Sequence, residues 1–333
     1  MSRTQETFSS CRISVRVAVR MLWCAAATSI PFGGHTQDYP SKPIRVITAE
    51  AGGGSDFAAR LVTQELTAYL GQQLIVDNRG GSTTIPGELL TKARPDGYTL
   101  LVYGSTIWLA PLLQAKAAYN PMREFSPISS VAVSPYIMAL PASVTASTVS
   151  ELIALAKLMP GKLNYAGALP GSLTHLGAEL FNAMAGVKII GVHYKGTGPA
   201  ITALLAGEVQ LLISPAGAVM PHIKSGRVKA LAITSIRPSV LLPGLPTVAS
   251  SGLPGYETEI MHASFAPAGT PSSLINRLTR ELLRALTRTE IRDKFFSAGV
   301  EARGSSPQEL EKTMASEIGK WSKIIGDAGI RID

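Results

Sequence analysis

The stretch that decides the fold is residues 43–56, "PIRVITAEAGGGSD". Residues 43–48 are a short apolar run, which predicts a buried strand. The glycines at 52–54 come next, and a helical pattern of apolar residues begins at Phe57 and stops at Gly71. Glycines between a strand and a helix expose backbone N–H groups at the helix start, where the helix dipole also favours negative charge. The stretch therefore predicts an α/β unit with an anion-binding loop.

This glycine loop departs from both common nucleotide-binding motifs. It lacks the Gly-Lys-Ser/Thr that ends a phosphate-binding loop. Gly52 and Gly54 match the first two glycines of the dinucleotide fingerprint, but Phe57 occupies the third position. Asp77, at the end of the next predicted strand, is placed like the ribose-binding acid of that fingerprint, so a dinucleotide site stays as a minor alternative.

Strands and helices alternate along the rest of the chain. Strands are predicted at 43–48, 73–78, 95–105, 134–140, 163–167, 188–194, 209–214 and 228–234. Helices are predicted at 57–70, 86–93, 149–163, 175–186, 198–206, 215–225, 271–287, 289–298 and 306–326. The βαβ order predicts parallel strands, with ligands at their carboxyl ends. The strands are too many for one compact sheet, so the pattern predicts two α/β domains.

Composition narrows the function classes. The chain has 333 residues, of which 46% are hydrophobic and 16% charged, and its net charge is +8. This composition supports one large or two medium folded domains. Residues 38–333 contain no dense run of Lys and Arg interleaved with aromatic residues, so we expect no nucleic-acid partner. A mild positive balance suits small anions.

Residues 1–37 resemble an export signal. Arginines at 12, 16 and 20 precede a short apolar core at 21–27, and small and polar residues follow before Asp38. The core is far shorter than the ~20 apolar residues of a spanning helix. We therefore predict a signal peptide over 1–37, cleavage between about Ala27 and Tyr39, and a periplasmic protein without an anchor. The alternative is a disordered N-terminus with no export role.

The remaining chain carries few reactive groups in a catalytic pattern. Both cysteines, Cys11 and Cys24, lie in the predicted signal peptide, so the mature chain has no thiol. There is no Gly-x-Ser-x-Gly motif and no acid pair that suggests general acid and base catalysis. The other histidines, at 175, 193, 222 and 262, lack paired metal-ligand spacing. The sequence predicts a protein that is not an enzyme and has no cofactor or metal.

A second polar loop, residues 168–175, repeats the arrangement of the first. It leaves a predicted strand and enters a predicted helix, with Ser172 or Thr174 as candidate N-caps. In the first loop, Ser55 or Asp56 is the expected cap. Two such loops in two domains suggest two helix N-termini that face each other across a cleft and hold an anion without arginines.

Several longer segments carry a family resemblance. They are "YPSKPIRVIT" (39–48), "LGQQLIVDNRGG" (70–81), "ARPDGYTLLVYGST" (93–106), "PGKLNYAG" (160–167), "VHYKGTGPAITALLAGEVQLL" (192–212), "PHIKSGRVKALAIT" (221–234), "LPTVASSGLPGYE" (245–257) and "APAGTP" (266–271). Together they resemble the Bug family, the periplasmic solute receptors of tripartite tricarboxylate transporters. The resemblance extends from Tyr39 to about Ile330.

This resemblance implies a fold, a function and partners. The expected fold is a two-domain "Venus flytrap" periplasmic binding protein, each domain being a mainly parallel α/β sheet flanked by helices. Domain 1 is expected to be discontinuous, over 38–140 and 263–333, with domain 2 over 141–262. The expected function is a monomeric receptor that binds a small carboxylate in the cleft and delivers it to membrane transporter subunits. The alternatives are a sensing subunit that presents its ligand to a membrane kinase and an enzyme on the same fold.

The resemblance also assigns candidate ligand-binding residues. They are Gly52, Gly53, Gly54, Ser55 and Asp56 in the first loop; Ala168, Gly171, Ser172, Thr174 and His175 in the second; and Ser105, Thr106, Tyr194 and Ser214, with Gly196 beside Tyr194. Several positions depart from the family pattern, among them residues 48–50, the loop 82–86, Gln210 and Ser214. Glu50 places an extra acid beside the expected anion site, and Ser214 stands where the family usually has an aspartate.

Overall fold

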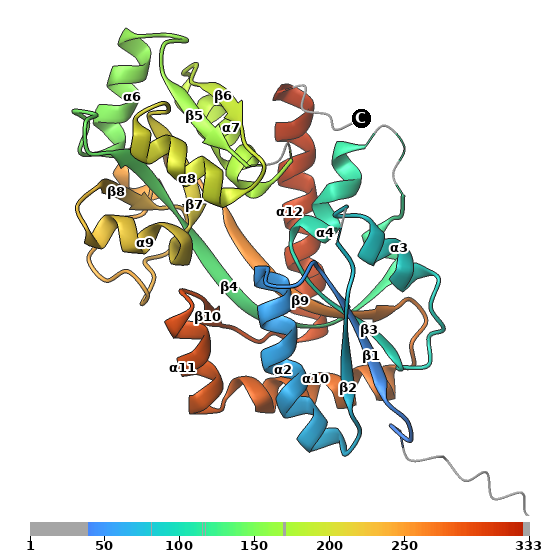
Figure 1. Cartoon of the computed structure of the whole chain (residues 1–333). Coiled ribbons are helices and arrows are strands. Elements are labelled where there is room, and N and C mark those ends of the chain that lie inside the picture. Colours follow the sequence, from blue (N-terminus) through green and yellow to red (C-terminus); the bar gives the residue numbers. More distant parts are fainter. Residues whose placement is uncertain (1–38, 81, 115, 117, 169–170, 329–333) are drawn as a thin grey trace, which may run out of the picture. The chain divides into compact units, whose positions relative to one another are not determined.

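Strands and helices alternate along the chain, as the sequence pattern predicts (Figure 1). The computed structural model describes residues 39–333 except 81, 115, 117, 169–170 and 329–333, so the predicted signal peptide, residues 1–37, lies outside the described residues. The strands are β1 (Ile44–Thr48), β2 (Leu74–Asn78), β3 (Thr99–Gly104), β4 (Phe125–Pro141), β5 (Asn164–Gly167), β6 (Ile190–His193), β7 (Leu211–Pro215), β8 (Val228–Ile233), β9 (Glu259–Pro267) and β10 (Glu301–Ala302). The longer helices are α2 (Gly54–Leu70), α3 (Ile85–Thr91), α6 (Val149–Leu158), α7 (Leu173–Ala185), α8 (Thr197–Ala206), α9 (Ala216–Lys224), α10 (Ser272–Leu286), α11 (Thr289–Ser297) and α12 (Pro307–Ala328), and the short helix α4 (Thr106–Leu109) follows β3.

Strand β4 joins two groups of strands into one hydrogen-bonded network. Its first part, residues 125–135, pairs with β9 and, near its end, with β10. Its second part, residues 136–141, pairs with β7 and β8. The sequence pattern located only residues 134–140 of this strand, because nearly all of its residues are buried and no alternation of apolar and polar residues marks its first half.

The other strands form two parallel triplets that point in opposite directions. β1, β2 and β3 are parallel to one another, as are β5, β6 and β7. β3 and β4 are both antiparallel to β9, so the first triplet runs in the same direction as β4. β7 is antiparallel to β4, so the second triplet runs against it. Each triplet therefore ends facing the other.

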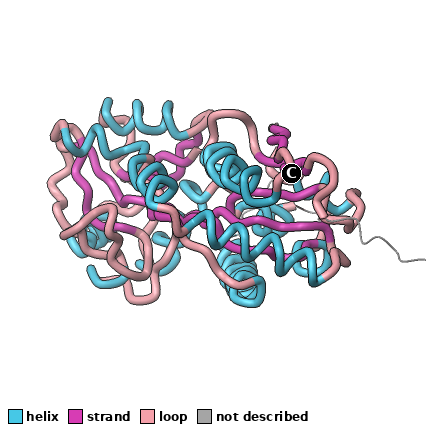
Figure 2. Tube along the Cα trace, turned by 90° about the horizontal axis from the view of Figure 1, so that it is seen from below, coloured by secondary structure: helices cyan, strands magenta, loops and turns pink. Residues whose placement is uncertain are grey.

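Helices cover both faces of these strands, as Figure 2 shows, and the predicted α/β class is confirmed. Each triplet is parallel, but the pairs with β4 and β9 are antiparallel, so the sheets are mixed. Eight of the described strands are paired in the order β2-β1-β3-β9-β4-β7-β5-β6, and β8 and β10 each pair with β4, so all ten are connected, and residues 40–333 form one compact unit. The division into two domains stays a prediction.

Local sequence signals explain where individual helices stop. α2 ends at Gly71, which adopts the left-handed conformation (φ 70°) that favours glycine, as predicted. The helical segment 149–163 is predicted to be closed by Pro160 and Gly161, and α6 ends at Leu158. The reason is Pro160, because a proline disfavours helical geometry at the residue before it, here Met159.

Three buried serines of β4 attach the segment before α12 to the strand. Ser130 Oγ donates to the Arg303 carbonyl at 2.6 Å, and Ser129 Oγ donates to the Ser305 carbonyl at 2.8 Å. Ser134 Oγ donates to the Gly299 carbonyl at 3.2 Å. These bonds satisfy the hydroxyls of three buried serines beside β10, which has only two residues.

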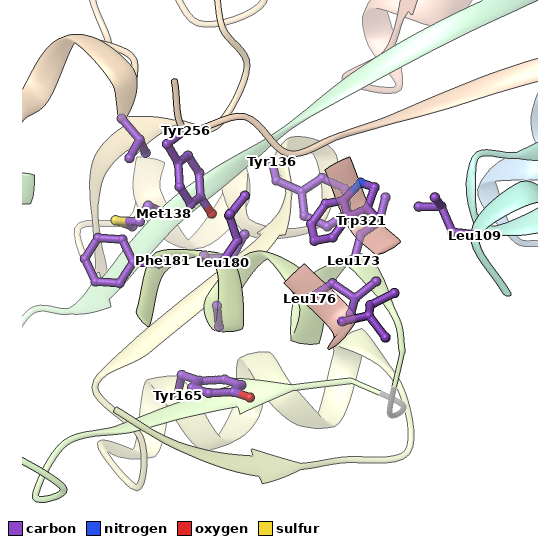
Figure 3. Close-up of a cluster of buried hydrophobic side chains, with 14 of the residues drawn as sticks. Leu109, Tyr136, Met138, Tyr165, Leu173, Leu176, Leu180, Phe181, Tyr256 and Trp321 are labelled. Atoms are coloured by element: carbon purple, nitrogen blue, oxygen red, sulfur yellow. The ribbon is translucent and has the colours of Figure 1, made fainter. Parts of the chain in front are cut away.

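One hydrophobic cluster extends over both strand groups, and α12 contributes to its centre. Figure 3 shows Trp321 of α12 among Tyr136 of β4 and Leu173 and Leu176 of α7. Leu109 of α4 belongs to the same cluster. Trp321 is only 2% exposed, so α12 packs α7 and α4 together through a large apolar side chain.

We predict that Trp321→Ala lowers the free energy of unfolding by about 3–5 kcal/mol, because it leaves a cavity at this junction. Urea denaturation followed by circular dichroism measures the change. Leu158→Ala is the control, since Leu158 is 81% exposed and its truncation should change the unfolding free energy little. Equal effects of the two substitutions would contradict this role of α12.

Candidate ligand-binding site

The two facing sets of strand ends define the region where a ligand is expected. Gly104, the last residue of β3, pairs with His262 of β9, and His262 pairs with Ala132 of β4. Ser214 of β7 pairs with Ile137 of β4. The two sets of strand ends are therefore five residue steps apart along β4, from Ala132 to Ile137, which is roughly 16 Å at the rise of a β-strand. Loops and helix N-termini that follow the parallel strands project into this interval.

The first glycine loop presents backbone N–H groups at the start of α2. Gly52 has φ +82°, a left-handed conformation that only glycine adopts readily. Gly53 is the N-cap of α2 in an extended conformation and has no side chain to cap the helix, so the expected cap at Ser55 or Asp56 is wrong. The amides of Gly54, Ser55 and Asp56 have no acceptor among the described residues. They are the first-turn donors that an anion can use.

The Asp56 carboxylate holds this loop in shape. It accepts from the Gly52 amide at 2.9 Å and from Asn78 Nδ2 at 2.8 Å, and it forms an ion pair with Arg60 at 2.9 Å. Burial alone raises the pKa of Asp56, but the hydrogen bonds from Asn78, Gly52 and Arg60 outweigh it and lower the pKa below its ordinary value. Asn78 Nδ2 also donates to the Ala49 carbonyl at 2.8 Å. The Asp56 carboxylate is therefore fully engaged by groups of the protein, and only the backbone amide of Asp56 is available to a ligand.

Ser55 connects α2 with β3 and β9. Its Oγ accepts from the Gly104 amide at 3.0 Å and lies 3.5 Å from His262 Nδ1. The Ser55 hydroxyl can also donate to His262 Nδ1, and in that tautomer the single N–H proton of the neutral imidazole lies on Nε2. A Cβ atom on Gly54 would lie 3.4 Å from His262 Nε2, so this N–H is adjacent to the α2 N-terminus.

Reasoning from the sequence missed His262 as a site residue. It lies on β9, more than 200 positions from the glycine loop, and no spacing motif marks it. Burial lowers the pKa of His262 to about 4, so the ring is neutral near pH 7. A neutral N–H donor beside helix amides suits an anion without adding a fixed charge.

Ser105 and Thr106 follow β3 at the same edge as the first loop. Ser105 is the N-cap residue of α4 and is only 1% exposed, and its hydroxyl has no partner among the described residues. Thr106 is half-buried and begins α4. Since an unpaired buried hydroxyl costs about 1–3 kcal/mol, Ser105 is a plausible hydrogen-bonding position for an additional group.

The second loop is organised by His175 and Ser172. The Gly171 amide donates to His175 Nδ1 at 2.9 Å, which places the proton of the neutral ring on Nε2. Ser172 is the N-cap of α7, and its Oγ accepts from the His175 amide at 3.4 Å. Burial, with a smaller contribution from His193, lowers the pKa of His175 to about 4. The second loop, like the first, therefore offers neutral donors.

Other candidate residues gather around this loop. Ala168 is buried, Thr174 is 2% exposed, and the Tyr194 amide donates to the Gly167 carbonyl at 2.9 Å. Gly196, the N-cap of α8, has φ 116° and brings a second helix start to the ends of the β5–β7 triplet. His193, at the end of β6, places its ring 4.6 Å from that of His175 in an edge-to-face arrangement.

Ser214 lies near the end of β7, with its side chain fully buried and its hydroxyl unpaired among the described residues. The structure thus gathers the candidates into two groups. The first contains loop 52–56, Ser105 and Thr106, and the second contains Ala168, residues 171–175, Tyr194 and Ser214. Whether a ligand contacts them stays a prediction.

The described residues contain no group of three or more His, Cys, Asp or Glu side chains arranged to hold a metal ion. No helix among them is both long and apolar enough to cross a membrane. What the two groups share is N–H and O–H donors at helix starts, which can bind an anion.

Comparison with known proteins identifies this arrangement. Residues 58–330 match the family described as the tripartite tricarboxylate transporter family receptor. The R. palustris protein Rpa4515, solved with adipate, is 32% identical with a TM-score of 0.76, over 88% of this chain and 99% of its own. The periplasmic binding protein BugD is 30% identical with a TM-score of 0.73, over 88% and 99%. MatC from Rhodopseudomonas palustris, solved with bound malate, is 29% identical with a TM-score of 0.72, over 86% and 100%.

These similarities confirm the resemblance found in the sequence and extend over nearly all of the described chain. The chain therefore belongs to the tripartite tricarboxylate transporter receptor family, the Bug family of solute-binding receptors, whose members are not enzymes.

Proposed function

We propose that this protein is an extracytoplasmic receptor that binds a small dicarboxylate between the two facing sets of strand ends and delivers it to a tripartite tricarboxylate-type membrane transporter. The observation that carries the proposal is the opposed direction of the parallel triplets, which turns the start of α2 toward the starts of α7 and α8. A ligand with an anionic group at each end fits such an arrangement. Adipate and malate, bound by two relatives, both have this form.

Neutral donors are sufficient for this task. Each hydrogen bond to a charged group contributes roughly 1.5–3 kcal/mol, so a few of them account for micromolar affinity, about 8 kcal/mol. The free amides of Gly54, Ser55 and Asp56 supply three donors on one side. Ser172 and the Nε2–H groups of His175 and His262 are the proposed further donors. No arginine is needed, in agreement with the expectation from the sequence.

The two-domain division belongs to the same proposal. Residues 38–140 with 263–333 would form one domain and residues 141–262 the other, so the chain would pass between them through β4 and through β9. Thr234 supports this placement: its Oγ1 donates to the Tyr136 carbonyl at 3.0 Å, and its carbonyl accepts from the Thr258 amide at 2.9 Å. The connecting segments thus lie side by side, as a hinge between two domains requires.

We propose a periplasmic location, because BugD is a periplasmic binding protein and residues 1–37 have the pattern of an export signal. The expected result is a mature N-terminus between about Ala27 and Tyr39. Intact mass spectrometry of protein from a periplasmic extract measures it. A product that retains Met1 would contradict export by cleavage.

Gly53→Val should reduce the affinity for adipate and malate more than tenfold. Gly53 has φ −79°, and a Cβ atom there would approach only Glu50, at 3.4 Å or more, so the variant is expected to fold. The β-branched side chain would nonetheless cover the amides at the start of α2. Isothermal titration calorimetry measures the affinity. In the control Gly319→Val, the new side chain enters open space on α12 and binding should be unchanged; unchanged binding in Gly53→Val would remove the first loop from the site.

Ser172→Ala should weaken dicarboxylate binding about tenfold by removing one hydroxyl donor. It also removes a helix N-cap, which costs about 1 kcal/mol of stability by itself. Thr148→Ala is the matched control, because Thr148 Oγ1 caps α6 by accepting from the Glu151 amide at 3.1 Å. Thermal unfolding with and without ligand separates the two effects: both variants should melt earlier, but only Ser172→Ala should lose part of the ligand-induced rise. Equal ligand-induced rises would show that Ser172 acts only as a cap.

A further inference from the structure

Glu50 places an acidic side chain at the first glycine loop. Its carbonyl accepts from the Gly53 amide at 3.4 Å. A Cβ atom on Gly53 would lie 3.8 Å from Glu50 Oε1, and a Cβ atom on Gly80 would lie 3.8 Å from Glu50 Oε2. The carboxylate is therefore located between the loops that follow β1 and β2, beside the N-cap of α2.

Two observations describe the surroundings of the Glu50 carboxylate: it lies near Tyr103, and it has no partner among the described residues. Burial raises the pKa of Tyr103 to about 12, with a contribution from the negative charge of Glu50, so the acid also lies near the end of β3. Glu50 is exposed, and its carboxylate has no ion pair or hydrogen bond with any described residue. The Asp56 and Asp77 carboxylates of the same region are paired with Arg60, Arg45 or Arg79. Glu50 is thus an unpaired acceptor among the ends of β1, β2 and β3.

An unpaired carboxylate at this position conflicts with a simple anion. The amides of Gly54, Ser55 and Asp56 favour a ligand carboxylate, but Glu50 repels the same group at short range. A hydroxyl or ammonium group on the carbon next to the ligand carboxylate resolves the conflict, because it donates to Glu50 while the ligand carboxylate accepts from the amides. An ammonium group would also neutralise the charge of Glu50.

We infer that Glu50 is a specificity-determining residue that selects dicarboxylates with a hydrogen-bond donor on the carbon adjacent to one carboxylate. The inference rests on the proposed receptor function and names the ligand class of that site. A site that pairs such a donor should discriminate against an analogue without it, because the acceptor is then left beside an anion with no partner.

Succinate, malate and aspartate test this inference, since they share one four-carbon skeleton and differ at the second carbon in carrying hydrogen, hydroxyl or ammonium. Isothermal titration calorimetry at pH 7.5 would compare the three ligands on wild type, Glu50→Gln and the control Glu311→Gln, an exposed acid on α12. Wild type and the control should bind malate or aspartate about 10- to 100-fold more tightly than succinate. Glu50→Gln should lose most of the preference for aspartate over succinate, through tighter binding of succinate and weaker binding of aspartate, because it removes the charge but keeps an oxygen that accepts a hydrogen bond. The ratio of aspartate to malate affinity on wild type identifies which donor the site prefers.

The failures of the two proposals can be distinguished. If wild type binds succinate as tightly as malate and aspartate, or if Glu50→Gln changes neither the affinity for succinate nor the affinity for aspartate, the role of Glu50 is overturned while the receptor function stands. Binding of adipate without binding of succinate, malate or aspartate would likewise overturn the role of Glu50 and leave the receptor function standing. If wild type binds none of the four dicarboxylates, both proposals are overturned. Melting temperatures of the two variants, expected to equal that of wild type without ligand, confirm that differences in affinity do not come from misfolding.

Discussion

The pairing of β4 on both of its edges is the constraint on which the rest of the structure depends. Its first part is hydrogen-bonded to β9 and β10 and its second part to β7 and β8. Because a strand has one direction, its partners inherit theirs from it: β1–β3 run with β4 and β5–β7 run against it. Ligands of parallel sheets bind beyond the carboxyl ends of the strands. Because both parallel triplets are joined to β4 in opposite directions, the carboxyl ends of β1–β3 face the carboxyl ends of β5–β7.

The core and the polar contacts of β4 maintain that arrangement. Trp321 packs with apolar residues from β4, α4 and α7 in one cluster, so α12 contacts elements that belong to both strand groups. Ser129, Ser130 and Ser134 bind carbonyls of residues 299–305 and satisfy polar groups that would otherwise be buried without partners. The relative placement of the two glycine loops therefore comes from packing and pairing remote from the loops themselves.

The proposed site relies on donors that carry no net charge. Asp56 is paired within the loop, and the pKa values of His175 and His262 are lowered by burial, to about 4 in each case, so both rings are neutral near pH 7. An unpaired buried charge costs more free energy than an unpaired amide or neutral imidazole. A site built from neutral donors is therefore less destabilised when no ligand is bound. Glu50 is the exception among the described residues of the first loop, which is why it carries the inference about ligand class.

The sequence by itself determined the order of most strands and helices, the α/β class, the two glycine-containing loops and the family, because each depends on short-range patterns of apolar, glycine and capping residues. It placed the stop of α2 at Gly71 for the same reason. It predicted neither β9 nor β10. Only the tertiary structure decided the length of β4, whose uniform burial gives no periodic signal, and the N-cap at Gly53, since the Asp56 side chain is held by Asn78 and Arg60 instead. His262 and the unpaired position of Glu50 also emerged only in three dimensions. They depend on contacts between residues far apart in the chain, and no local pattern records such contacts.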